Sequence, residues 1–243
     1  MPGHDIIVVG ASAGGVEALV TLARALKRNL QAAVFVVLHI PAQSPSFLPD
    51  ILNRAGPLKA VQATDDMQIE QGHIYIAPPD HHMLIELGKV CVVRGPKENR
   101  HRPAIDPLFR SAALAYGQRV VGVILTGALD DGTAGLLAVK RLGGIAIVQD
   151  PDEALYPSMP LSALENVEVD YTLHLASIGP QLGQLAGKRA KEEGGYLVSE
   201  DMEKETKLKE HVTEQRAALI RRVLLKNEPS VETEAEQEQH QNA

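Results

Sequence analysis

Short apolar runs recur along the first three quarters of the chain, and amphipathic stretches separate them. Runs such as 33–38 and 120–125 show no alternation with polar residues, which is typical of strands buried on both faces of a parallel sheet. The runs predict strands at 5–9, 33–38, 58–62, 120–125, 144–148 and 167–172. The stretches between them predict helices at about 14–27, 44–55, 107–117, 133–142, 161–166 and 175–188. This alternation indicates an α/β fold with a doubly wound, largely parallel sheet and flanking helices.

The pattern changes between residues 73 and 93, where the apolar runs are shorter and turn residues lie between them. The segments 73–77, 82–86 and 90–93 are separated by Pro78-Pro79-Asp80 and by Gly88. Short runs joined by tight turns are typical of antiparallel strands. We therefore expect these segments to pair as a small antiparallel hairpin at the edge of the sheet.

Two acids stand before predicted helices. Asp106 precedes Pro107, and an acid at the N-cap with proline at the first helical position is a good helix start. Asp131 lies just before Gly132 and the helix predicted at 133–142. Taken alone, Asp131 is explained equally well as the N-cap of that helix and as a functional carboxylate.

The composition changes near residue 190. Residues 201–226 are rich in Glu, Lys, Arg and Leu, and Leu208, Val212, Leu219 and Val223 are spaced to share one helix face. Residues 228–243 contain little that a fold could bury. We predict a folded domain over 1–190, a charged helix over 191–227 and a disordered acidic tail over 228–243.

Length and composition exclude several classes of protein. A chain of 243 residues fits one sizeable domain and an appendage, and the 44% apolar but 3% aromatic content indicates an aliphatic core. No apolar segment approaches the roughly 18 residues of a membrane span, so membrane insertion is not expected. The lone Cys91 allows no internal disulfide and suits a reducing, cytoplasmic location. The net charge of −7 argues against nucleic acid as a partner.

The first predicted strand runs directly into Gly10-Ala11-Ser12-Ala13-Gly14-Gly15, and an amphipathic helix follows. Two chemistries use such a strand, glycine turn and helix. A nucleophile elbow holds a serine in a strained turn, so that its hydroxyl projects from the edge of the sheet. A dinucleotide-binding turn uses similar glycines to bring backbone N–H groups against a pyrophosphate.

The rest of the chain disfavours the dinucleotide interpretation. Such a site needs an acid at the end of the second strand to bind a ribose hydroxyl. Here the second strand ends in Leu38-His39-Ile40-Pro41, so a histidine stands where the acid would be. Short-chain dehydrogenases begin similarly, but none of the five tyrosines has the lysine four residues later that those enzymes need.

The same edge of the sheet carries the groups that a serine hydrolase needs. Ser12 follows the first strand, His39 the second, and the strand at 120–125 leads to Asp130 and Asp131. Because parallel strands end at one edge, a hydroxyl, an imidazole and a carboxylate are brought together. Singly, each has an ordinary structural explanation, such as a helix cap or a solvated strand end. The chain order Ser, His, Asp differs from that of α/β-hydrolases, so that fold is not implied.

Five segments in order resemble one family, the protein-glutamate methylesterases of bacterial chemotaxis, through the catalytic domain called CheB. The resemblance covers residues 5 to about 180. The matching segments are 5–15, Leu38-His39-Ile40-Pro41, 73–80, Asn99-Arg100-His101-Arg102-Pro103 and 123–132. Family members often carry an N-terminal receiver domain that blocks the site until it is phosphorylated. The nucleophile strand here begins at residue 5, so we expect a stand-alone catalytic form.

The resemblance implies a role for each site residue. Ser12 would be the nucleophile, His39 the general base and Asp131 the orienting acid. Backbone N–H groups at Ala13 and Ala128 would form the oxyanion hole, although the family usually has threonine and methionine at these positions. No cofactor and no metal are implied. The basic loop that carries Arg100 and Arg102 would contact an acidic receptor helix, although solvated loop charges explain these arginines equally well.

The implied function is hydrolysis of glutamyl methyl esters on chemoreceptors with release of methanol, within a two-component signal-transduction pathway. The same triad would also serve glutamine deamidation. The implied partners are methylated receptor helices, with a separate response regulator or a receptor-modifying methyltransferase. The alternative is a non-catalytic adaptor that keeps the fold in order to bind a receptor or regulator. Methanol release from methylated receptor separates these two functions.

Overall fold

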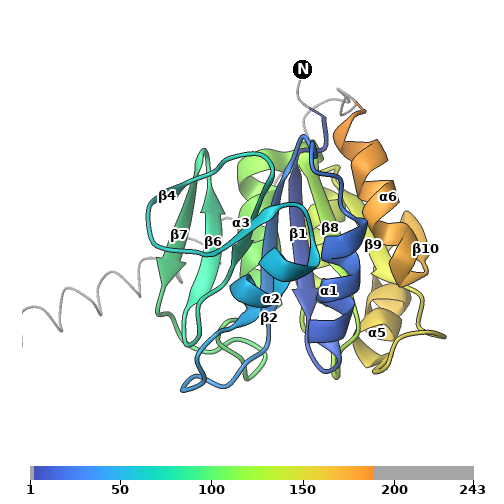
Figure 1. Ribbon diagram of the computed structural model, residues 1–243. Helices are drawn as coiled ribbons and strands as arrows, with labels where there is room; N and C mark the ends of the chain where they lie inside the picture. Colours follow the sequence, from blue (N-terminus) through green and yellow to red (C-terminus); the bar gives the residue numbers. More distant parts are fainter. Residues whose placement is uncertain (1–2, 189–243) are drawn as a thin grey trace, which may run out of the picture.

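The computed structural model describes residues 3–188 and shows a central sheet covered on both faces (Figure 1). In the described part of the chain this sheet has seven strands in the order β10-β9-β8-β1-β2-β5-β3, and neighbouring strands are parallel throughout. The strands are β1 (Ile6–Ala11), β2 (Ala33–Leu38), β3 (Lys59–Gln62), β5 (His73–Ile76), β8 (Val120–Ile124), β9 (Ile145–Gln149) and β10 (Tyr171–Leu173). The chain starts in the middle of the sheet and winds outward in both directions, as predicted for a doubly wound fold.

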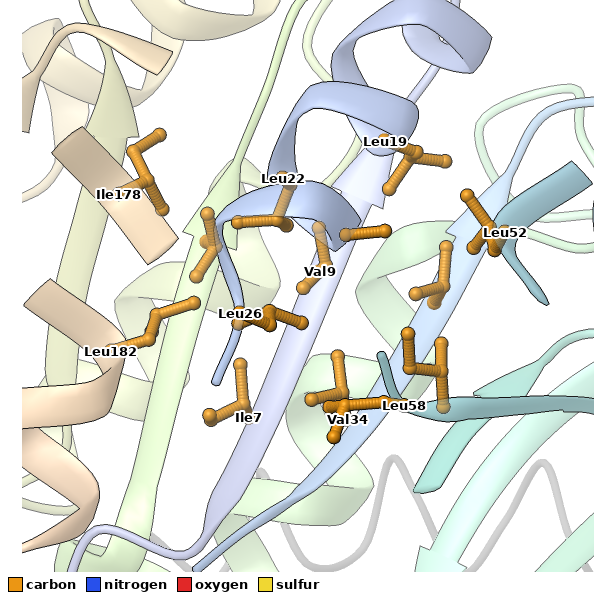
Figure 2. Close-up of a cluster of buried hydrophobic side chains, with 14 of the residues drawn as sticks. Ile7, Val9, Leu19, Leu22, Leu26, Val34, Leu52, Leu58, Ile178 and Leu182 are labelled. Carbon is orange, nitrogen blue, oxygen red and sulfur yellow. The ribbon is translucent and has the colours of Figure 1, made fainter. Parts of the chain in front are cut away.

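Helices cover each face of this sheet. The helices are α1 (Gly15–Ala25), α2 (Leu48–Ala55), α3 (Ile105–Tyr116), α4 (Thr133–Arg141), α5 (Ser158–Asn166) and α6 (Leu175–Ala186), with a 3₁₀ turn at Gly117–Arg119. Side chains of α1, α2 and α6 pack on one face, where Ile7 and Val9 of β1 meet Leu22 and Ile178 (Figure 2). Side chains of α3, α4 and α5 pack on the other face, against Val8 and its neighbours.

Both faces of β1 are therefore fully buried. Every residue of β1 and β2 is buried, which is why neither strand shows polar alternation in the sequence. Successive side chains of a strand point to opposite faces, so Ile7 and Val9 belong to one core and Ile6 and Val8 to the other. The result is a fully buried central strand whose carboxyl end leads into the serine turn.

The antiparallel part has a different third strand from the one that the sequence predicted. The strands β4 (Met67–Gln68), β6 (His82–Glu86) and β7 (Lys89–Val93) form a separate sheet in the order β4-β7-β6. The prediction that 73–77 joins this hairpin at the edge is wrong, because β5 pairs in parallel with β2 and β3 inside the main sheet. β5 is as short as a hairpin strand, and only its pairing partners show that it is a strand of the parallel sheet.

Several helix boundaries also differ from the predicted ones, and α5 begins at Ser158 where the prediction has 161. The helix predicted from residue 44 begins at Leu48, with Pro49 in its first turn. The predicted N-cap Asp106 lies inside the first turn of α3, and Ala104 occupies the N-cap position. No helix among the described residues is long and apolar enough to cross a membrane. The segments predicted at 191–227 and 228–243 lie outside the described residues.

Candidate active site

The three predicted site residues follow adjacent strands. In the sheet β1 lies between β8 and β2, and the paired residues Gly10 with Ile124 and Ala11 with Leu38 place the three strand ends side by side. The Ser12 N–H donates to the carbonyl oxygen of Thr126 at 3.0 Å. The His39 N–H donates to the carbonyl oxygen of Ala11 at 3.2 Å. These bonds extend the pairing past the sheet and fix where each site residue leaves it.

At Gly14 and Gly15, after Ser12, neighbouring side chains leave little room for a Cβ atom. Gly14 adopts φ +71°, a left-handed conformation that other residues rarely adopt, and an added Cβ would lie 3.0 Å from the Leu155 side chain. A Cβ on Gly15 would lie 2.7 Å from the Leu38 side chain. The turn closes with a hydrogen bond from the Gly15 N–H to the Ser12 carbonyl oxygen at 2.8 Å. The glycines therefore shape a tight turn that presents Ser12.

Ser12, His39 and Asp131 form one chain of hydrogen bonds. The Ser12 Oγ lies 3.0 Å from His39 Nδ1, and His39 Nε2 lies 2.7 Å from Asp131 Oδ2. Since an ionised carboxylate only accepts, Nε2 carries the proton and donates it, which leaves Nδ1 free to accept from the serine hydroxyl. Serine proteases of the chymotrypsin type use the two ring nitrogens the other way round. The His39 side chain is 5% exposed and that of Asp131 2%.

Asp131 does not cap the helix that follows it. Gly132 is the N-cap of α4 and makes no side-chain cap bond. Instead the Asp131 carboxylate accepts the backbone N–H of Ile105 at 2.7 Å and that of Asp106 at 3.2 Å, in the first turn of α3. The N-terminus of a helix stabilises negative charge. Asp131 is thus held by the dipole of α3 as well as by His39.

Asp106 makes the reciprocal contact. Its Oδ1 accepts the N–H groups of Gly132 and Gly135, at the start of α4, at 3.1 and 2.7 Å. Asp131 therefore caps the N-terminus of α3, and Asp106 caps the N-terminus of α4. Together the two acids tie the starts of these helices to each other. Burial raises the pKa of Asp106, and the nearby Asp131 charge raises it further. Burial also acts to raise the pKa of Asp131, but hydrogen bonds from His39 and Ile105 outweigh it, and the net shift is downward.

A loop at residues 94–104 completes the environment of the triad. Asn99 Nδ2 donates to Asp131 Oδ1 at 2.6 Å and to Asp106 Oδ2 at 2.7 Å, so one amide bridges both buried acids. The His101 ring stacks on the His39 ring, with centroids 3.7 Å apart and planes 6° apart. In the sequence this segment is distinguished only by its resemblance to the family and by its arginines. No feature of its pattern signals that it folds back over the triad.

The two arginines of this loop differ in their contacts. Arg102 donates from Nε to Asp80 at 2.9 Å and from Nη1 to the carbonyl oxygen of Gly95, and its Nη2 also contacts Asp80. Its side chain is 16% exposed, so Arg102 braces the loop and has little surface for a substrate. Arg100 is exposed, with φ +68°, and its contact with a partner stays a prediction.

His82 anchors the same loop from β6. Its Nε2 donates to the carbonyl oxygen of Pro96 at 2.8 Å, and its Nδ1 accepts the N–H of Ala104 at 3.2 Å. The bond accepted at Nδ1 requires the neutral ring, because a protonated Nδ1 cannot accept, whereas Nε2 donates in either protonation state. Burial lowers the pKa of the His82 imidazole below its ordinary range.

This shift predicts acid sensitivity. Below about pH 6.5 residue 82 is protonated more fully in the unfolded chain than in the folded protein, so the free energy of unfolding falls with pH, by at most about 1.4 kcal/mol per pH unit. In urea unfolding, His82→Gln should lose less stability than the parent between about pH 7.5 and 5.5, since glutamine both donates and accepts. His81→Gln, on the neighbouring half-buried histidine, is the control. Equal acid sensitivity of both variants would contradict the assignment.

The predicted oxyanion donors lie at the two turns beside Ser12. Within residues 3–188 the backbone N–H groups of Ala13 and Ala128 make no hydrogen bond to a protein acceptor. The neighbouring N–H groups are used structurally, since Ser12 donates to Thr126 and Gly127 to Tyr156. Thr126 Oγ1 donates to the carbonyl oxygen of Ala13 at 3.0 Å and so ties the two turns together.

The described residues contain no group of three or more histidine, cysteine or acidic side chains suited to a metal.

Comparisons with known proteins agree on one family. The model of the CheB methylesterase family matches residues 7–182. The crystal structure of the Thermotoga maritima CheB methylesterase catalytic domain superposes with a TM-score of 0.71 at 34% identity. This match covers 74% of the present chain and 98% of the Thermotoga chain.

Curated relatives point the same way. A protein of Leptospira interrogans is 40% identical over 176 residues, which cover 72% of this chain and 91% of the relative. The protein-glutamate methylesterase/protein-glutamine glutaminase of Hydrogenovibrio crunogenus is 36% identical over 191 residues. The Pyrococcus abyssi protein of the same name is 33% identical over 182 residues. The match covers 50% of each of the last two relatives and 77% and 73% of this chain, respectively.

Proposed function

Because the chain belongs to the CheB methylesterase family, we propose that it hydrolyses γ-glutamyl methyl esters of chemoreceptors and releases methanol. The observation that carries the proposal is the hydrogen-bond chain from Ser12 through His39 to Asp131, at the carboxyl edge of the sheet. The roles of the individual residues are part of the proposal.

In the first step Ser12 Oγ attacks the ester carbonyl while His39 Nδ1 takes the hydroxyl proton. The N–H groups of Ala13 and Ala128 are the proposed donors to the oxyanion of the tetrahedral intermediate. As the intermediate collapses, His39 returns the proton to the leaving methoxide, and methanol departs. Water, deprotonated by His39, then attacks the acyl-serine, which frees the serine and leaves a glutamate side chain.

Asp131 acts through His39. It holds the proton on Nε2, which keeps Nδ1 as the acceptor, and its charge stabilises the imidazolium formed during each step. The lowered pKa of Asp131, set by burial against the bonds from His39 and Ile105, keeps it ionised at neutral pH. The same steps on a glutamine side chain would release ammonia, and the names of the curated relatives include this second activity.

The direct test is methanol release from methylated chemoreceptor by the full-length chain. Release above the background of receptor alone supports the enzyme, and binding of receptor without release supports the adaptor alternative. A serine-directed phosphonate adds a second test, because mass spectrometry should place its adduct on Ser12. An adduct on any other serine would contradict the nucleophile assignment.

The finer partner assignments remain proposals. Methylated receptor helices are the proposed substrate, and a separate response regulator or receptor-modifying methyltransferase is the proposed regulator. The exposed Arg100 is the candidate contact for an acidic receptor surface. A reducing, cytoplasmic location fits these partners, and no cofactor is proposed.

Truncation near residue 190 tests the proposed domain boundary. The sheet, the triad and both cores lie within residues 3–188, and the family model matches 7–182. A chain that ends near 190 should therefore fold and hydrolyse a small ester at the rate of the full chain. The comparison is turnover of a small ester and of methylated receptor by both proteins. Loss confined to the receptor assigns the C-terminal region to recognition, whereas equal loss on both substrates would show that the boundary is wrong.

A further inference from the structure

His101 has no assigned role in the reaction, although its ring lies flat against the proposed general base. The two imidazoles are 3.7 Å apart between centroids and 6° from parallel. Among the described residues no protein group hydrogen-bonds to the His101 ring. The ring is therefore placed by its backbone and by stacking, and it covers one face of His39.

The backbone of His101 is firmly held. Its N–H and carbonyl form a pair of hydrogen bonds with the carbonyl and N–H of Glu98, at 2.8 and 3.1 Å. Arg110 of α3 donates to Glu98 at 2.7 Å. Arg102 ties the loop to Asp80, and His82 ties it at Pro96 and Ala104. These bonds fix the backbone of the 94–104 loop, and the loop in turn fixes the position of the His101 ring over His39.

We propose that His101 is a positioning residue for the general base, whose uncharged ring covers His39 and holds the imidazole in the plane shared by Ser12 and Asp131. The proposal rests on the proposed function, since it concerns the base of that reaction. It makes two demands on residue 101: a flat ring for packing, and no charge next to the imidazolium that forms on His39.

The charges around His101 favour its neutral form. His39 faces it from the end of β2 and Asp131 from the loop before α4, while Lys97 and Arg100 lie on its own loop. Burial lowers the pKa of His101, and a positive charge on His39 acts in the same direction, against the opposing effect of Asp131. A neutral aromatic face beside a cation is favourable, whereas a second cation at this distance is strongly unfavourable.

Three variants of the full chain separate the two demands. His101→Ala removes the ring, His101→Phe keeps a flat ring without charge, and His101→Arg keeps a flat group with a permanent charge. Measured on a small glutamyl methyl ester, kcat should fall about tenfold or more in His101→Ala, because the base loses its fixed orientation. His101→Phe should restore most of it. KM should change little, since the ring packs on the base and not on the substrate.

The charged variant supplies a readout that a purely structural defect would not move. A fixed cation opposes protonation of His39, so His101→Arg should lower kcat about tenfold or more relative to His101→Phe. The acid limb of its kcat/KM profile should also move to lower pH. Circular dichroism and thermal unfolding of each variant show whether the fold is retained.

A second measurement does not depend on turnover. In a Ser12→Ala background, the ring-current shifts of the His39 ring protons in NMR spectra should persist in His101→Phe and disappear in His101→Ala. Parental kcat in His101→Ala, or identical acid limbs in the Arg and Phe variants, would overturn the proposal while ester hydrolysis by the parent stands. Absence of hydrolysis by the parent chain would instead count against the proposed function, and with it against any role for His101 in the reaction.

Discussion

Ser12→Ala should lower kcat for glutamyl methyl ester hydrolysis by roughly 10⁴-fold or more, by analogy with nucleophile deletions in other serine hydrolases. The reason is chemical, since alanine has no oxygen to form the acyl-enzyme and His39 Nδ1 loses the hydroxyl it faces at 3.0 Å. The fold should persist, because the Ser12 backbone bonds to Thr126 and Gly15 do not involve the side chain. Stopped-assay methanol release and a circular dichroism spectrum measure the two effects.

Ser158→Ala is the matched control. Ser158 is exposed at the start of α5, so the same atomic change there should leave kcat near the parental value. The phosphonate adduct should form in Ser158→Ala and be absent in Ser12→Ala. A Ser12→Ala rate within tenfold of the parent would contradict the triad assignment, even if the family membership holds.

Asp131→Asn should lower kcat by roughly 10³–10⁴-fold, as the same change does in a well-studied triad. The amide cannot stabilise the imidazolium, and it permits the wrong tautomer of His39. The wild-type carboxylate accepts from four donors: His39, Asn99 and the N–H groups of Ile105 and Asp106. An amide nitrogen would face some of these donors, so the free energy of unfolding should also fall by about 1–3 kcal/mol.

Asp130→Asn is the control for this prediction, since the two acids are adjacent in the chain. Asp130 is exposed, and within residues 3–188 its one hydrogen bond is accepted by the backbone carbonyl from the Thr133 N–H at 3.1 Å. Asp130→Asn should therefore cost little in either kcat or stability. Both effects are read from methanol release and urea unfolding of the two variants. A larger loss in Asp130→Asn would show that the structure assigns the wrong carboxylate.

Much of the fold was readable because its physics is local. A strand buried on both faces is apolar at nearly every position, so unbroken apolar runs in the sequence predict β1, β2 and β8. Their parallel direction follows from the helices between them, and parallel strands deliver their last residues to one edge. That reasoning alone brought Ser12, His39 and the pair Asp130 and Asp131 to a common edge, and the family resemblance selected Asp131.

Other features depended on contacts between segments that lie far apart in the sequence. The sequence of β5 suits a hairpin strand and a short parallel strand equally, and its place between β2 and β3 is decided by the packing of the whole sheet. Asp106 looks like an ordinary N-cap, yet it lies within its own helix and caps α4. Arg102 looks like a loop charge available to a partner, yet it is bound to Asp80.

The sequence by itself determined the doubly wound sheet and the three groups at its edge, because burial pattern and strand direction are properties of short segments. The tertiary structure alone decided what surrounds those groups. Asn99 reaches Asp131 across 32 positions of sequence, and the His101 ring meets a histidine that follows a distant strand. Such contacts depend on how a loop folds back, which is set by anchors such as His82 that carry no local signal. The positions of Ser12, His39 and Asp131 were therefore predictable, whereas the contacts that Asn99, His82 and His101 make around them were not.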